Sequence, residues 1–189
     1  MSQDHAHEHD SECAVAHGDA PHEPADRREL LAVYATPVAA YLLRWGRELG
    51  FRTSLLEPDP TRVTAEHRAA AEAVAGSAAE VTLTASTDVI VSDHHRDDLG
   101  ATMAPLVTAA PRWIGIMGSP RHAPPHVPAL LAQGVSEQLI ATVHRPIGLD
   151  IGSKAPAEIA LSTLAGLLAD RNDRAGGLPA PSTTTPVTA

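Results

Sequence analysis

Short apolar runs alternate with helical patterns between residues 30 and 171, and this alternation leaves few folds open to the chain. The apolar runs predict strands at 30–34, 53–57, 81–84, 88–93 and 112–117. The periodic segments predict helices at 37–49, 64–76, 97–109, 126–133, 136–143 and 156–171. Strands that alternate with helices predict an α/β domain of three layers, with a mostly parallel, doubly wound sheet.

The first helix carries clear signals at both ends. Thr36 is a good N-cap residue, and Pro37 suits the first helical position because its missing N–H would have no partner there. Gly50 follows the last apolar position and is typical of a residue that ends a helix.

One junction does not fit a parallel sheet. Only Ala85, Ser86 and Thr87 separate the run at 81–84 from the run at 88–93. Parallel neighbours need a crossover of about a dozen residues or more. Either 81–84 is a marginal edge strand or an intervening helix has been lost, and we predict the first.

Both ends of the chain differ in composition from the middle. Residues 1–27 are rich in Asp, Glu, Ala and Pro, with few large apolar side chains, so we expect a disordered tail. Its histidines are His5, His7, His9, His17 and His22. Such tracts capture metals without selectivity, and we predict no specific metal site. Residues 175–189 predict a second flexible tail, which leaves 28–174 as the folded domain.

Charge and cysteine usage exclude several classes of protein. The net charge of -9 argues against a nucleic-acid partner, which would require a basic face. The single cysteine, Cys13, excludes an internal disulfide framework and favours the reducing cytoplasm. No apolar run approaches the ~20 residues of a membrane span. The polar, acidic N-terminus also lacks the pattern of a signal peptide.

The first strand–helix turn lacks the features of a dinucleotide site. Glycines at this turn normally let backbone N–H groups approach a pyrophosphate, but residues 34–39 contain none, and Pro37 removes one N–H. Glu57, at the end of the second strand, stands where a ribose-binding carboxylate would lie. A plain structural turn therefore remains the competing interpretation, and we expect no strong NAD(P) binding.

Three later segments place polar residues at the ends of predicted strands or before a helix. Asp93 and His94 lie at the carboxyl end of the strand at 88–93, at the edge where open α/β sheets bind ligands. A histidine beside a carboxylate suits acid–base or ligand-binding roles. The alternative is an Asp that caps a helix, with solvated histidines.

The loop after the strand at 112–117 predicts a site that faces an anion. Gly118 permits unusual backbone angles, Ser119 offers a hydroxyl, and Arg121 has a guanidinium that suits a phosphate. The segment 144–152 is similar, with Asp150 as an acceptor between Gly148 and Gly152. A surface turn is the alternative for the first segment, and a purely structural set of turns for the second.

The same segments carry a family resemblance over about residues 30–172. Residues 114–119 with Arg121, followed by 147–152 and its extension 156–162, resemble the C-terminal, Rossmann-like domain of the XdhC/CoxI family. Members are accessory proteins of xanthine dehydrogenase and carbon monoxide dehydrogenase, which are molybdenum hydroxylases. The resemblance implies a chaperone-like protein that binds or handles molybdenum cofactor and supports its insertion into the hydroxylase apoenzyme.

This chain departs from the family pattern at three places. Tyr34 and Thr36 replace glycines, the N-terminal domain with its cysteine motif is absent, and the segment before Asp88 looks shortened. We therefore predict a non-catalytic accessory protein with a single Rossmann-like domain, able to form a homodimer. The predicted binding residues for a molybdopterin-type ligand are Asp93, His94, Gly118, Ser119, Arg121, Gly148, Asp150 and Gly152. The alternatives are an NAD(P)-dependent oxidoreductase and a degenerate protein-binding scaffold.

Overall fold

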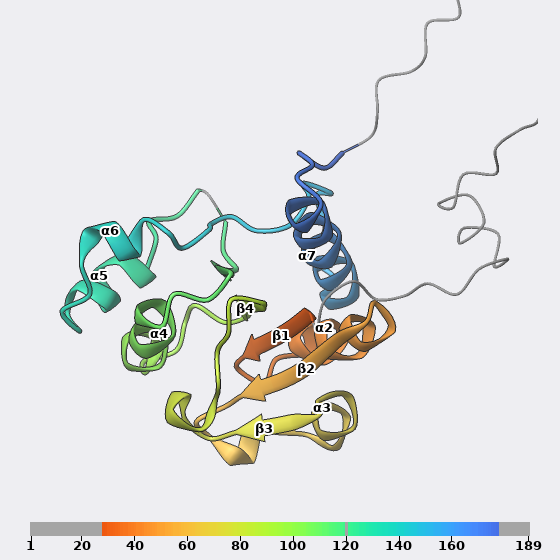
Figure 1. Cartoon of the computed structure of the whole chain (residues 1–189), viewed down its shortest axis with the longest axis horizontal. Coiled ribbons are helices and arrows are strands. Elements are labelled where there is room, and N and C mark those ends of the chain that lie inside the picture. The colour runs from red at the N-terminus through yellow and green to blue at the C-terminus, as the bar shows by residue number, and fades with distance from the viewer. Residues whose placement is uncertain (1–27, 120, 178–189) are drawn as a thin grey trace, which may run out of the picture.

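The computed structural model describes residues 28–119 and 121–177, and a parallel sheet lies at its centre (Figure 1). Within these residues the strand order is β3-β2-β1-β4-β5, with every neighbouring pair parallel. The strands are β1 (Arg28–Val33), β2 (Phe51–Leu56), β3 (Ala73–Ala75), β4 (Thr87–Val91) and β5 (Trp113–Ile116). The predicted α/β fold with a doubly wound, Rossmann-like sheet is confirmed.

Helices cover the two faces of this sheet. On one face pack α2 (Pro37–Glu48), α3 (Ala65–Ala70) and α7 (Pro156–Arg171). On the other pack α4 (Leu99–Thr108), α5 (His126–Leu131) and α6 (Glu137–Ile140). Two short 3-10 turns, η1 (Pro60–Arg62) and η2 (Ala78–Glu80), lie in the connections. The alternation of side chains along each strand gives the sheet two apolar faces, so each helical layer closes its own core.

The signals at the start of α2 work as the sequence predicts. The hydroxyl oxygen of Thr36 accepts a hydrogen bond from the backbone N–H of Ala39 at 3.1 Å, and Pro37 is the first helical residue. Gly50 adopts a φ of 83°, a left-handed conformation that costs glycine little. The helix therefore begins directly after the carboxyl end of β1.

The predicted helix at 64–76 is wrong in its second half. The helix α3 ends at Ala70, and the residues after it form β3. Alanine favours helices, but the free edge of β2 offers unpaired backbone groups, and Ser54 to Leu56 pair with Ala73 to Ala75. Pairing with a neighbouring strand overrides the helical preference of this segment.

The predicted strand at 81–84 is also wrong, because these residues join no strand in the described sheet. Val81 and Leu83 instead pack against the core on the α4 face, which explains their apolar alternation. The crossover from β3 back to β4 runs through residues 76–86 and contains η2 but no α-helix. The alternative of a lost helix thus describes this connection better than an edge strand.

The order of the strands reverses between β1 and β4, since β2 follows β1 on one side and β5 follows β4 on the other. Ligands of open α/β sheets bind at the carboxyl ends of strands near such a reversal. Beyond β5, His144 extends the sheet: its N–H donates to Ile114 O at 2.9 Å and its carbonyl accepts from Ile116 N at 3.0 Å. The residues that follow His144 therefore lie at the carboxyl edge of the sheet, beside the loops after β4 and β5, before α7 begins.

A buried ion pair network fastens α7 at the opposite edge. The carboxylate of Asp88, with no exposed side-chain surface, binds Arg112 and lies 2.6 Å from Arg171 Nε. Arg171 also donates to Ser86 O at 2.7 Å, and Arg112 binds Asp170 at 2.9 Å. The last turn of α7 is therefore tied to the amino end of β4.

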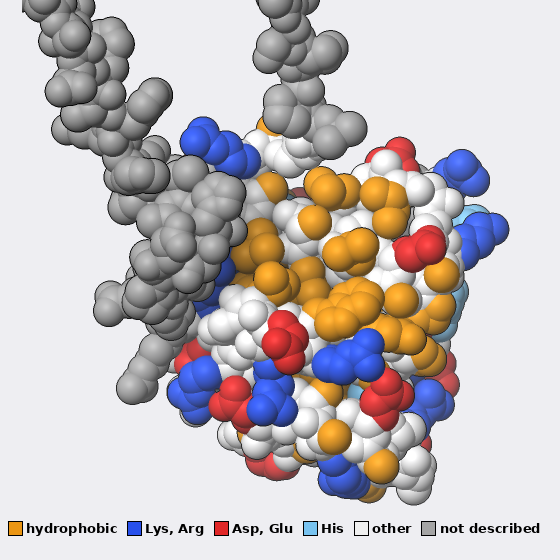
Figure 2. Space-filling model, turned by 90° about the vertical axis from the view of Figure 1, so that its right-hand side faces the viewer, with side chains coloured by type: hydrophobic (Ala, Val, Ile, Leu, Met, Phe, Trp, Pro, Cys, Tyr) orange, Lys and Arg blue, Asp and Glu red, His pale blue; other side chains and the backbone are white. Residues whose placement is uncertain are grey.

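Hydrophobic side chains gather on the side of the molecule shown in Figure 2. The outward residue Leu161 of α7 is 57% exposed. Exposed apolar groups of this kind are typical of interfaces, but the homodimer stays a prediction. No helix within the described residues has the length and apolar character to cross a membrane. The predicted tail at 1–27, and residues 178–189 of the second tail, lie outside the described residues.

We expect Asp88→Ala to destabilise the fold strongly. The substitution leaves two half-buried arginines without their shared carboxylate, and breaking a buried pair costs about 3–5 kcal/mol. The free energy of unfolding, measured in urea, tests this. Asp170→Ala is the matched control, because Asp170 binds the same Arg112 from an exposed position, and its loss should cost about 1 kcal/mol or less. Equal losses in the two variants would contradict the assignment.

Candidate functional site

A cleft of about 650 Å³ opens at the carboxyl edge of β4 and β5. It lies between the loops that follow these strands, the segment 146–154 and one side of α7. The structure brings all eight residues of the predicted site to this cleft: Asp93, His94, Gly118, Ser119, Arg121, Gly148, Asp150 and Gly152. Their placement agrees with the expectation that carboxyl ends of parallel strands share an edge, while their role in binding stays a prediction.

The first wall follows β4. Asp93 accepts a hydrogen bond from His95 N at 2.9 Å, so its carboxylate shapes the local turn as well as facing the cleft. The rings of His94 and His95 lie 4.0 Å apart. Burial, together with the charges of His95 and Arg145, lowers the pKa of His94. His94 is therefore neutral at pH 7 and can either donate or accept a hydrogen bond.

The second wall is the loop after β5. Arg121 is exposed, its backbone N–H donates to Ser119 Oγ at 3.3 Å, and no ion pair engages its guanidinium within the described residues. Arg145 fastens this loop from behind, donating to Ser119 O at 2.8 Å and to His122 O at 3.2 Å. The guanidinium lies so close to Gly118 that a Cβ there would stand 2.7 Å from Arg145 Nε. A side chain at position 118 would therefore have to displace the Arg145 guanidinium from this loop.

Arg145 was missed among the predicted site residues, although it belongs to the segment that carried the resemblance. The only sequence signal was its place directly before Pro146 in that segment. Its role depends on a contact between residues that are 26 positions apart, which spacing alone does not reveal.

The third wall is the segment that leads into α7. Gly148 has a φ of 85°, and a Cβ there would lie 2.6 Å from Ser162 Oγ. Leu149 N donates to Ser162 O at 3.1 Å, and a Cβ on Gly166 would lie 3.1 Å from Gly148 Cα. Gly148 thus lets the loop lie directly against the helix. Gly152 has a φ of 68°, and a Cβ there would meet no other atom within 4 Å. At this position glycine is favoured by the backbone conformation and not by packing.

The cleft carries charges of both signs. Arg121 and Lys154 supply cations, and Asp93 and Asp150 supply carboxylates. Ser162 and Thr163 of α7 add hydroxyl groups, and these two residues and Lys154 were not predicted. A ligand that matches this set has an anionic group and, at a distance from it, N–H or O–H donors.

The turn where a dinucleotide fold places its pyrophosphate is closed by other side chains. Glu57 is 1% exposed and accepts hydrogen bonds from Ala35 N at 2.8 Å and Asp59 N at 2.9 Å. Arg96 binds it with both terminal nitrogens, at 2.9 Å and 3.1 Å. Burial alone would raise the pKa of Glu57, but Arg96 and the two backbone donors lower it. Both oxygens of the Glu57 carboxylate, which was predicted as a possible ribose ligand, are thus already engaged by Arg96 and backbone N–H groups.

Tyr34 occupies the space beside this ion pair. It is completely buried with a φ of 74°, and the guanidinium carbon of Arg96 lies 4.4 Å from the centre of its ring. Burial raises the pKa of the Tyr34 phenol, so it stays protonated. A large side chain fills the position at which a dinucleotide fold needs a glycine.

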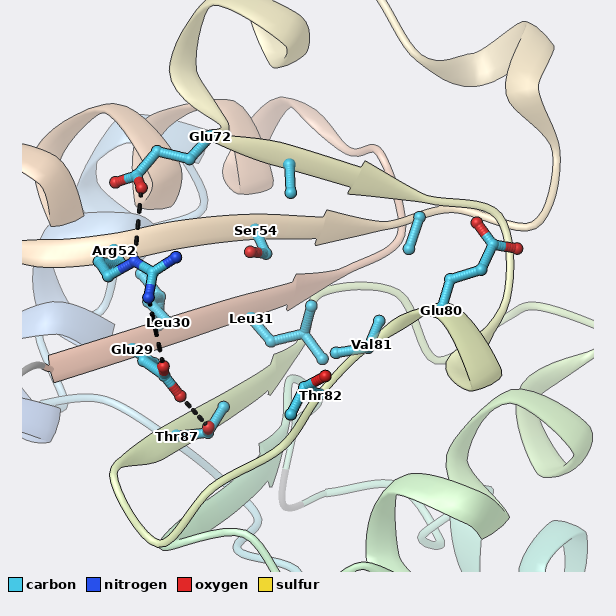
Figure 3. A pocket seen from close by; sticks show the side chains of 12 residues that line it. Glu29, Leu30, Leu31, Arg52, Ser54, Glu72, Glu80, Val81, Thr82 and Thr87 are labelled. Carbon is cyan, nitrogen blue, oxygen red and sulfur yellow. Dashed lines mark hydrogen bonds and ion pairs between the residues drawn. The ribbon is translucent and has the colours of Figure 1, made fainter.

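A further hollow, of about 450 Å³, lies on the sheet beside the crossover at residues 76–86 (Figure 3). Its charged groups are engaged by neighbouring residues: Arg52 lies 3.9 Å from Glu29 and 3.6 Å from Glu72, and Glu80 accepts hydrogen bonds from Gly76 N at 3.1 Å and Ser77 Oγ at 2.8 Å. Glu29 also accepts a hydrogen bond from Thr87 at 2.6 Å. None of the predicted site residues lines it. Within residues 28–119 and 121–177, no cluster of three or more His, Cys, Asp or Glu side chains could hold a metal ion.

We expect NAD and NADP to bind weakly or not at all. The closed turn lacks several backbone donors to a pyrophosphate, each with a net value of ~1 kcal/mol or more, and their loss lowers affinity by orders of magnitude. Calorimetric titration of the full chain with either dinucleotide tests this. A dissociation constant in the low micromolar range would show that the turn opens.

Comparisons with known proteins agree with this architecture. Residues 30–167 match the family model described as the XdhC Rossmann domain. A stretch of 66 residues is 41% identical to the uncharacterized protein YqeB of Escherichia coli strain K12, covering 35% of this chain and 12% of YqeB. A crystal structure of a xanthine dehydrogenase from Bacillus halodurans matches with a TM-score of 0.65 at 20% identity, covering 79% of this chain and 46% of that one. The match to the Bacillus halodurans structure shows the fold alone. This chain spans less than half the length of YqeB and less than half the length of the Bacillus halodurans protein.

Proposed function

The chain belongs to the XdhC Rossmann-domain family, and on that premise we propose that it is an accessory protein for the maturation of a molybdenum hydroxylase. Its cargo would be the molybdenum cofactor, and its partner the hydroxylase apoenzyme. The observation that carries this proposal is the cleft itself. The eight predicted binding residues come from three separate segments of the sequence, and all of them line one concave surface at the edge where α/β sheets bind ligands.

The cleft suits the two ends of a pterin-type ligand. A phosphate requires a cation and close backbone approach, which Arg121 and the glycine at position 118 supply. Lys154 adds a second cation on the opposite wall. Asp150 would accept a hydrogen bond from a ring N–H at the other end, because a carboxylate is a strong acceptor for such a donor.

Contacts within the protein hold the loops of this cleft in place. Arg145 binds two carbonyl groups of the loop after β5, and the contact between Gly148 and Gly166 seats the other loop on α7. Side chains and backbone groups that are already positioned lose little entropy on binding. The chain would therefore bind and orient its cargo without a large rearrangement, as a carrier protein requires.

The closed turn at β1 argues against the oxidoreductase alternative. The Glu57–Arg96 pair and the buried ring of Tyr34 take the space and the carboxylate that a dinucleotide would use. The scaffold alternative, a domain that contacts its partner protein without a ligand, differs from our proposal in one respect. Only our proposal requires the cleft to bind the cofactor.

We expect Arg121→Ala to weaken molybdenum-cofactor binding about tenfold. Loss of a charge-assisted hydrogen bond to a phosphate costs ~1.5–3 kcal/mol. Arg121 is exposed and makes no ion pair within the described residues, so folding stability should not change. Titration of the purified chain with the cofactor, and activation of the hydroxylase on co-expression, measure the effect.

The matched control is Arg68→Ala, which removes an exposed arginine of α3 outside the cleft. It should bind the cofactor like the wild type. Undetectable binding by the wild type, or full hydroxylase activation by Arg121→Ala, would end the ligand-site proposal and favour the scaffold.

A further inference from the structure

Two adjacent histidines, His94 and His95, line the wall of the cleft that follows β4. Their rings lie 4.0 Å apart, with an angle of 41° between the ring planes. The turn that carries them is held by the backbone N–H of His95, which donates to the Asp93 carboxylate at 2.9 Å. Two imidazolium rings this close repel each other, so the pair takes up one proton more readily than two.

The other charged side chains of the cleft balance one another. Among the described residues that line it, the cations are Arg121 and Lys154, and the carboxylates are Asp93 and Asp150. With neutral histidines this lining therefore has no net charge, and a bound anion leaves the cleft with an excess of negative charge. Histidine is the side chain of this lining that can offset the excess by gaining a proton between pH 5 and 8.

His94 is kept neutral by its surroundings in the absence of a ligand. Burial lowers its pKa most, and the charges of His95 and Arg145 lower it further. Asp93 and a hydrogen bond with the backbone of Met117 act in the opposite direction and raise the pKa. An anion in the cleft acts in the same direction as Asp93, because negative charge favours the imidazolium form.

We propose that the cleft binds its anionic ligand together with a proton, which the imidazole ring of His94 carries in the complex. Because a bound anion favours the protonated ring, the protonated ring favours the anion by the same factor. Release of the ligand returns the proton to solvent, so that capture and release of the cargo depend on pH. This inference rests on the proposed function, since it requires the cleft to bind an anion.

The direction of the pH dependence follows from the two states of His94. The gain in affinity is complete below the pKa of His94 in the free protein, where the ring is already charged. It is lost as the pH rises through the higher pKa that His94 has in the complex. Binding is therefore tighter in mildly acidic solution than in mildly basic solution.

NMR of the full chain with inorganic sulfate tests the proposal, because sulfate is a tetrahedral dianion whose charge stays constant between pH 5 and 8. The histidine ring resonances report the pKa of His94 with and without sulfate. Sodium chloride at matched ionic strength is the reference, since salt alone screens charges. We expect sulfate to raise the pKa of His94 by about one unit. His144, which does not line the cleft, should not respond.

Two matched variants separate the proton from the contact. The wild type should bind sulfate about tenfold more tightly at pH 5.5 than at pH 8, the equivalent of one pKa unit. His94→Gln keeps a hydrogen-bonding side chain but cannot take up a proton, so it should lose most of this dependence. His95→Gln removes the neighbouring charge and leaves His94 in place. It should keep the dependence, displaced to higher pH, because the repulsion that lowers the pKa of His94 is gone.

Failure of this inference is distinguishable from failure of the proposed function. Sulfate that perturbs the amides of Gly118 and Ser119 but leaves the pKa of His94 unchanged overturns the inference and leaves the ligand site standing. A folded His94→Gln that keeps the tenfold dependence does the same. If sulfate perturbs neither amide at up to about 100 mM, a very weak affinity, the inference falls, and titration with molybdenum cofactor decides the proposed function separately. If His94→Gln does not fold, the pKa of His94 in the wild type decides the question.

Discussion

The buried pair of Glu57 and Arg96 is the constraint on which the functional edge of this molecule depends. Glu57 directly follows β2, has no exposed side-chain surface, and accepts hydrogen bonds from the backbone N–H groups of Ala35 and Asp59. A carboxylate so deeply buried needs a cation, and Arg96, from the segment before α4, supplies it. The pair links the carboxyl ends of β1 and β2 to the segment before α4. The ring of Tyr34, which follows β1, packs against the guanidinium of Arg96. A Rossmann-like sheet thereby loses the opening that a dinucleotide requires.

Because side chains fill the turn after β1, the accessible cleft at the carboxyl edge of the sheet lies beside β4 and β5. There the loops are held by contacts of a different kind: Arg145 binds carbonyl groups behind Gly118, and Gly148 lies against Gly166 of α7. The far end of α7 is fixed by Asp88 and Arg171 at the opposite edge. The helix is thus anchored at both ends, and it forms one wall of the cleft.

Local signals made much of this structure predictable. The N-cap Thr36 and the periodic apolar positions of α7 depend on neighbours in the sequence, so those elements were predicted correctly. Residues 73–75 were predicted as helix because their pairing partner, β2, is distant along the chain. The cleft was located because parallel strands end at one edge. Arg145 and Gly166 were missed because each matters only through a loop that folds against it.

Hydrogen exchange of the full chain, with and without molybdenum cofactor, tests the central claim most directly, because amide protection reports where a ligand lies. The account predicts slower exchange in residues 118–122 and 148–154, which form two walls of the cleft. It predicts no change at the turn from Ala35 to Ala39, which the Glu57–Arg96 pair closes. Protection centred on that turn, or no protection at either wall, would contradict the account.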